Sequence, residues 1–89
     1  MRKKPEVVEP IRARILSRML EHGWIGGKHT AIEHLSSGIE VHRGKDVSNA
    51  VKSLIKEGLI IPKITHYGLQ VSLNPRMLDK VKRIIEEES

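Results

Sequence analysis

The residues with the clearest chemical meaning are basic and amide side chains at helical spacing in the middle of the chain. They recur every three or four positions and would share one outward face of a helix: Lys45, Ser48, Asn49, Lys52 and Lys56. Lysine pairs with phosphates or guanine acceptors, and asparagine bonds adenine in bidentate fashion. We interpret this face as a nucleic-acid-binding surface, the alternative being the solvated face of an ordinary amphipathic helix.

Further candidate contacts flank this segment. Arg43, just upstream, is placed to reach a nucleic-acid backbone or an adjoining base. Lys63, His66 and Tyr67 lie near the tip of an expected hairpin, where they would touch phosphates or the minor groove. One lysine and a neutral histidine make this tip a weak contact, and Tyr67 has the alternative of packing on the base of the hairpin.

The front of the chain is also basic. Arg2, Lys3 and Lys4 belong to an expected flexible arm, residues 1–9, which would either embrace a duplex non-specifically or remain solvated charge. Three arginines of the following segment are expected to lie off its apolar stripe, as a second phosphate-binding face or, preferably, as a solvated helix face: Arg12, Arg14 and Arg18.

Composition favours a polyanionic partner. The 89 residues hold 16 Lys and Arg against 11 Asp and Glu, a formal net charge of +5. The alternative is that this charge serves solubility alone. The absence of cysteine excludes disulfides and thiolate metal sites, and no apolar run approaches the ~18 residues that a membrane span requires. We therefore expect no membrane association and a cytoplasmic location, on the nucleoid in a prokaryote.

Catalytic and metal chemistry find little support. His29 and His34 are five residues apart, not the four that places two ligands on one helical face. The segment 26–30 resembles a phosphate loop only vaguely, because it lacks the leading glycine spacing and the strand–helix context. We expect no enzymatic activity, no metal and no cofactor.

Helical signals dominate the first two thirds of the chain. Pro10 and Gly23 bound a first helix with apolar residues at helical spacing. Thr30 and Glu33 have the spacing of a capping box, which predicts a short helix over Thr30–Leu35, and the preceding 24–27 is either a turn or a short strand. Lys45–Glu57 is a third helix, ended by a glycine.

The period then changes to that of strands. Leu59–Ile64 and Leu69–Leu73 flank a turn in which Gly68 can take a positive φ, and Pro62 requires an edge or a bulge. In the second strand Gln70 and Ser72 should point away from the core. Asn74 and Pro75 then cap and open a last helix. The predicted fold class is mainly α (α+β): three helices, a hairpin and a C-terminal helix.

This order resembles the winged helix-turn-helix superfamily, and more loosely small archaeal winged-helix proteins described as transcription regulators. The resemblance covers residues 10–73 and is carried by the short helix Thr30–Leu35, the basic helix ending in the run 54–60, and the hairpin through Thr65–Gly68. The connection 36–44 is longer than the usual turn of about three or four residues. The domain would span 10–74, with 75–89 completing it or forming a dimer element.

The resemblance implies double-stranded DNA binding and transcription regulation, with helix 45–57 in the major groove and the hairpin as the wing. Two alternatives remain open. One is an RNA- or ribosome-associated protein, because phosphate attraction does not distinguish RNA from DNA. The other is a protein–protein interaction module, in which the acidic tail and the last helix are the operative surface. A homodimer through that helix would read paired half-sites.

Overall fold

The computed structural model describes the backbone of residues 11–36 and 44–88, and the side chains of 11–35 and 46–88. The arm 1–9, the opening Pro10 and most of the connection 36–44 lie outside the described residues. The elements follow in the order α1 (Ile11–His22), β1 (Thr30–Ala31), α2 (Ile32–Ser36), α3 (Gly44–Lys56), β2 (Ile60–Thr65), β3 (Gly68–Leu73), a 3-10 turn (Pro75–Met77) and α4 (Leu78–Glu88).

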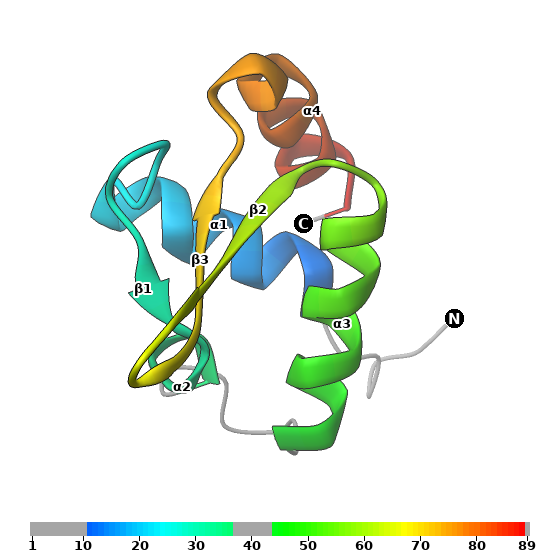
Figure 1. Cartoon of the computed structure of the whole chain (residues 1–89). Coiled ribbons are helices and arrows are strands. Elements are labelled where there is room, and N and C mark those ends of the chain that lie inside the picture. The colour runs from blue at the N-terminus through cyan, green and yellow to red at the C-terminus, as the bar shows by residue number, and fades with distance from the viewer. Residues whose placement is uncertain (1–10, 37–43, 89) are drawn as a thin grey trace.

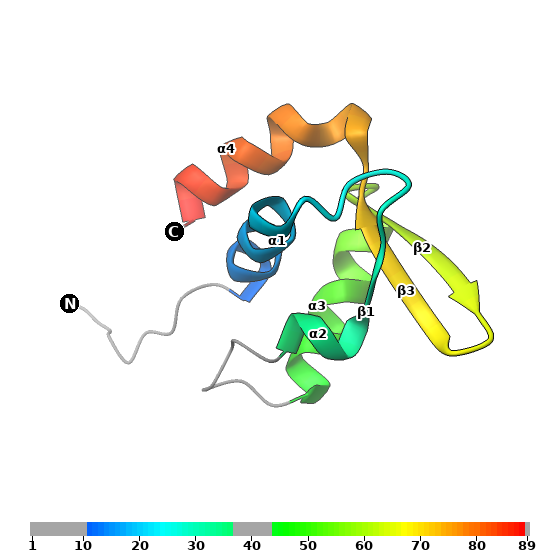
Figure 2. The ribbon, with the colours of Figure 1, turned by 90° about the vertical axis from the view of Figure 1, so that its left-hand side faces the viewer.

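The three strands form one antiparallel sheet in the order β1-β3-β2. Strand β3 is central: Ile60 pairs with Leu73 on one side, and Thr30 pairs with Val71 on the other. In Figure 1 the β2–β3 hairpin crosses in front of α1, with α3 at one side and α4 above. After a quarter turn, the tip of the hairpin projects beyond the helices (Figure 2). The structure is therefore a mixed α+β fold with a protruding hairpin.

One aliphatic core joins the helices to the sheet. The expected apolar stripes of the first, third and last helices are confirmed, because each contributes fully buried side chains. The strands add buried residues from the core-facing side of the hairpin. The buried set that holds these elements together comprises Ile15, Leu16, Met19, Leu35, Val47, Val51, Leu54, Leu59, Ile60, Val71, Leu73, Val81 and Ile84.

Helices α1 and α3 end in the same way. Gly23 (φ +71°) and Gly58 (φ +80°) adopt the left-handed conformation that side-chain-bearing residues rarely take. At α3, the Gly58 N–H donates to the Ile55 carbonyl and the Leu59 N–H donates to the Leu54 carbonyl, both at 3.0 Å. These two bonds define a Schellman motif, so the predicted glycine stops are confirmed with their mechanism.

The end of β3 is bonded to both helix ends. The Leu73 N–H donates to the Trp24 carbonyl at 2.8 Å, just after α1. The Asn74 N–H donates to the Leu59 carbonyl at 3.0 Å, and the Asn74 side-chain amide donates to the Gly58 carbonyl at 2.9 Å. The same side chain accepts from the Arg76 N–H at 3.0 Å, as the predicted cap requires. Asn74 therefore fixes the direction of α3 and the start of the last helix together.

Several predicted boundaries are wrong. Thr30 and Ala31 form a strand beside β3, and α2 begins only at Ile32, so the capping-box position does not open the helix. Strand pairing overrides the local signal, and the Thr30 hydroxyl lies 2.9 Å from Nδ1 of His34 instead. Ser72 is buried, although it alternates with the core residues Val71 and Leu73 and therefore lies on the other face of the sheet. The positive φ of Gly68 and the edge position of Pro62 are confirmed.

Membrane insertion has no candidate helix in the described ranges: none combines enough length with enough apolarity to cross a bilayer.

Replacing Asn74 by alanine removes a helix cap and the side-chain bond to Gly58. We expect Asn74→Ala to lower the free energy of unfolding by about 1–2 kcal/mol. Urea denaturation measures this difference, with Asn49→Ala as the matched control because Asn49 is exposed on α3. Equal stability of the two variants would contradict the role given to Asn74.

Candidate nucleic-acid interface

The outward side of α3 carries three of the predicted contact residues. Asn49, Lys52 and Lys56 are exposed and lie three and seven positions apart, on one line of the helix. Val47 and Val51, on the opposite side, are buried in the core. The helix is thus held by its apolar face and presents these three side chains, the α3 stripe, to solvent.

The other predicted contact residues of this region are either less exposed or have side chains outside the described part of the chain. Ser48 is half-buried at the edge of the α3 stripe. Lys45 belongs to the first turn of α3, but its side chain is outside the described part, as are Arg43 and the arm residues Arg2, Lys3 and Lys4. These residues remain predictions.

The acidic residues of α3 are displaced from the stripe. Asp46, in the first turn, and Glu57, immediately after the last residue, are eleven positions apart and lie on one flank of the helix. Ser53 lies on the same line, and its hydroxyl donates to Glu57 Oε2 at 3.5 Å. The stripe itself therefore carries only positive and amide groups among its described side chains.

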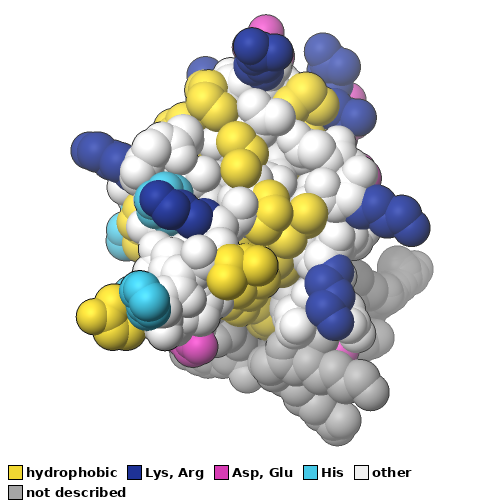
Figure 3. Space-filling model, viewed as in Figure 1, with side chains coloured by type: hydrophobic (Ala, Val, Ile, Leu, Met, Phe, Trp, Pro, Cys, Tyr) yellow, Lys and Arg dark blue, Asp and Glu magenta, His cyan; other side chains and the backbone are white. Residues whose placement is uncertain are grey.

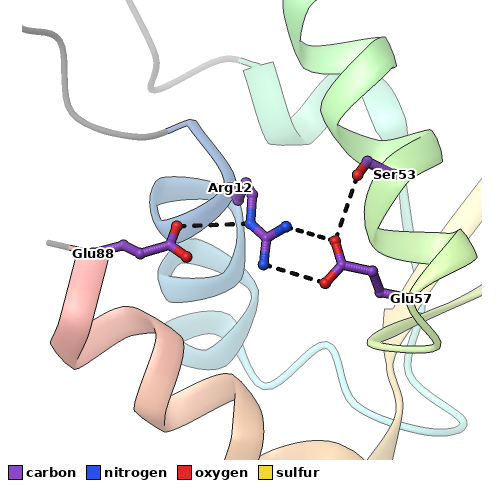
Figure 4. A network of polar contacts seen from close by, with 4 residues as sticks. All are labelled: Arg12, Ser53, Glu57 and Glu88. Atoms are coloured by element: carbon purple, nitrogen blue, oxygen red, sulfur yellow. Dashed lines mark hydrogen bonds and ion pairs between the residues drawn. The ribbon is translucent and has the colours of Figure 1, made fainter.

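Glu57 is neutralised by an arginine from α1. Arg12 donates through both terminal nitrogens, to Oε2 at 2.5 Å and to Oε1 at 3.3 Å, and its Nε lies 3.6 Å from a carboxylate oxygen of Glu88 in α4 (Figure 4). One guanidinium thus joins α1, α3 and α4. Bidentate pairing also cancels the carboxylate that directly follows Lys56.

The expectation that Arg12 lies off the apolar stripe is wrong. Its side chain is only 30% exposed. Arg12 precedes the buried Leu16 and Met19 by four and seven positions, so it begins the core-facing line of α1. This spacing from Leu16 and Met19 is the sequence feature that predicts a core-facing position for Arg12. Arg18 also has a structural partner, donating from Nε to the His34 carbonyl at the end of α2 at 3.0 Å.

The hairpin tip exposes all three of its predicted contact residues. Lys63 and His66 are exposed, and Tyr67 is 93% exposed, so the alternative that Tyr67 packs on the hairpin base is wrong. Figure 3 shows basic side chains on the α3 side of this face and hydrophobic ones between α3 and the hairpin. The described residues thus bring the α3 stripe and the tip to one face, with a less polar surface between them.

An aromatic stack was not foreseen from the sequence. The ring of Trp24 stacks on His22 with centroids 4.4 Å apart, and its other neighbour is His34 at 6.5 Å. The stack joins the end of α1 to α2, and none of its residues belongs to the α3 stripe. No group of three potential metal ligands was found within the described ranges.

Helix α4 differs from α3 in its charge. Its apolar stripe, including Val81 and Ile84, is buried, and α4 packs on α1. Its basic side chains lie toward the start and most of its acidic ones at the end, and the two balance in number across 75–88: Arg76, Lys80, Lys82 and Arg83 against Asp79, Glu86, Glu87 and Glu88. This helix therefore offers no excess of positive charge for a polyanion.

Comparison with known proteins adds no family: the chain matches no protein-family model and no curated protein sequence.

Removing the charge of Arg12 should weaken the junction of the three helices. We expect Arg12→Met to lower the free energy of unfolding by about 1 kcal/mol, a modest value because the pair is partly exposed. The loss should shrink in concentrated salt, which screens ion pairs. Thermal or urea denaturation at two salt concentrations measures both effects.

Arg83→Met is the matched control, because Arg83 is exposed on the outer face of α4. If the two variants lose equal stability, Arg12 does not hold the junction.

Proposed function

We propose that this chain is a winged helix-turn-helix domain that binds double-stranded DNA with α3 in the major groove and regulates transcription. The order of helices, with β1 added to the β2–β3 hairpin, supports that architecture. The observation that carries the proposal is the α3 stripe, because Asn49, Lys52 and Lys56 share the solvent side of one helix.

The dimensions of α3 suit this role. Thirteen residues make a helix about 20 Å long, and the major groove of B-form DNA, about 12 Å wide, admits a helix. Lys52 and Lys56 would pair with phosphates or guanine acceptors, and Asn49 would supply a bidentate contact to adenine. The Arg12–Glu57 pair favours this docking, since it removes a negative charge at the end of the stripe.

Duplex DNA is favoured over structured RNA for a geometric reason. The major groove of A-form RNA is deep and narrow, and side chains do not read it. A stripe that runs along the solvent side of a helix needs a wide groove. Single-strand binding by stacking is disfavoured because the chain holds only one Trp and one Tyr.

A homodimer through the last helix finds less support. The apolar side chains of α4 are buried or half-buried in this domain, and the exposed large hydrophobic residues among those described lie on β2 and at the hairpin tip. The proposal therefore treats the single domain as the DNA-binding unit.

Removing either lysine of the stripe should weaken binding to every duplex. We expect Lys52→Ala and Lys56→Ala to reduce affinity for random duplex DNA, and each to lower the salt slope of log K by about one. Fluorescence anisotropy at several salt concentrations measures this, with hairpin RNA and single strands as competing ligands. Lys82→Ala, on the outer face of α4, is the matched control and should bind normally.

An equal loss of DNA affinity in the Lys82→Ala control would indicate that the interface does not lie on α3. Tighter binding to hairpin RNA would favour the RNA alternative, and no binding at low salt would overturn nucleic-acid binding altogether.

Asn49 should govern sequence preference. On a duplex selected from a random pool, Asn49→Ala should reduce the preference over random duplex by roughly 5- to 150-fold, the equivalent of about 1–3 kcal/mol for one bidentate contact. Competition binding measures the ratio, and Lys82→Ala, on the outer face of α4, should leave it unchanged. A uniform loss on all duplexes in the Asn49 variant would refute base reading by this residue.

A further inference from the structure

The hairpin tip exposes apolar side chains that do not pack into the hydrophobic core. Ile64 is 86% exposed and Tyr67 is 93% exposed, whereas Ile60, on the same face of the same strand as Ile64, is buried. Alternate residues of a strand share a face, so the core-facing side of the hairpin continues past the core. Ile64 therefore lies on the helix-facing side of the hairpin but beyond the core. Its cross-strand partner is the half-buried Leu69.

The tip is held in one shape by its own hydrogen bonds. The Thr65 hydroxyl accepts from the Tyr67 N–H at 3.1 Å and donates to the Gly68 carbonyl at 2.9 Å. A side chain that inserts into a ligand loses less conformational freedom when its backbone is already fixed. The tip is thus pre-organised to present Ile64 and Tyr67.

One positive charge, a polar histidine and no negative charge surround the apolar side chains of the tip, which favours a polyanion over an apolar partner. Lys63, exposed, directly precedes Ile64, and the exposed His66 directly precedes Tyr67. Acidic residues are absent from 58–78, the whole stretch from the glycine after α3 to the start of α4. The tip projects beyond the helices, as Figure 2 shows, so it reaches farther from the core than α3 does.

We infer that this tip is an apolar wedge that enters the minor groove beside the α3 site and opens a base step with Ile64 and Tyr67. Small apolar wedges of this kind unstack DNA and bend it. A protein partner fits less well, because a stable interface needs about 800 Å² per side and the protruding tip is small. The inference rests on the proposed function and adds to it a DNA-deforming step.

The test uses the full chain and a selected duplex, prepared as a set with 2-aminopurine at each adenine in turn. Unstacking raises the fluorescence of this base. We expect the wild-type chain to raise it several-fold at one step only. Ile64→Ser and Tyr67→Ser should abolish the rise and weaken binding by roughly tenfold, an effect in keeping with the loss of an unstacking contact.

Ile61→Ser is the matched control, because Ile61 is 40% exposed but lies on the opposite face of the same strand. It should preserve the fluorescence rise, and circular dichroism should show all three variants folded. Duplex binding with no rise at any position, or an equal loss in the control, overturns the wedge while leaving the DNA-binding proposal intact. Failure of the wild type to bind duplex overturns both. Concentration-dependent self-association that the Ile64 and Tyr67 variants lose, with duplex binding unchanged, assigns the tip to a second copy instead and overturns the wedge.

Discussion

The architecture depends on a short hydrogen-bonded junction at the end of β3. Leu73 bonds to the loop after α1, and Asn74 bonds through its backbone and side chain to the end of α3. Each helix arrives there through a glycine in the left-handed conformation, which turns the chain sharply toward the sheet. Because β3 also pairs with β1 and β2, this one junction sets the angle between α3 and the hairpin. The relative placement of the α3 stripe and the tip follows from it.

A second constraint acts on the same end of α3. Arg12 occupies a core-facing position of α1 and pairs with Glu57, and the ion pair with Glu88 brings in α4. A charged group at the margin of an aliphatic core is stable only when it is paired, which explains why one guanidinium contacts two carboxylates. The same contact removes an acidic charge from the end of the proposed DNA-binding helix. Arg12 thus both holds the three helices together and reduces the negative charge beside the α3 stripe.

The sequence allowed the main helices, the hairpin and their glycine stops to be predicted, because apolar periodicity and capping residues are local signals. Strand β1 was missed: Thr30 carries a local helix-cap signal, and only its pairing with Val71 across the sheet overrides it. The core-facing position of Arg12 follows from its spacing to the buried Leu16, whereas its charge alone predicts a solvated position. The α3 stripe was predictable from spacing alone. The ion pair of Glu57 with Arg12 and the exposed position of Ile64 could not be predicted. Both depend on how distant segments pack in three dimensions, and local sequence patterns do not record that packing.

The central claim is that duplex DNA contacts α3 and the hairpin tip. Backbone amide chemical shifts, followed by NMR as a short duplex is added, test it residue by residue. The account predicts that the largest changes fall on residues 49–56 and 63–67, while 78–88 in α4 change little. Changes concentrated in α4, with the α3 stripe unaffected, would contradict it.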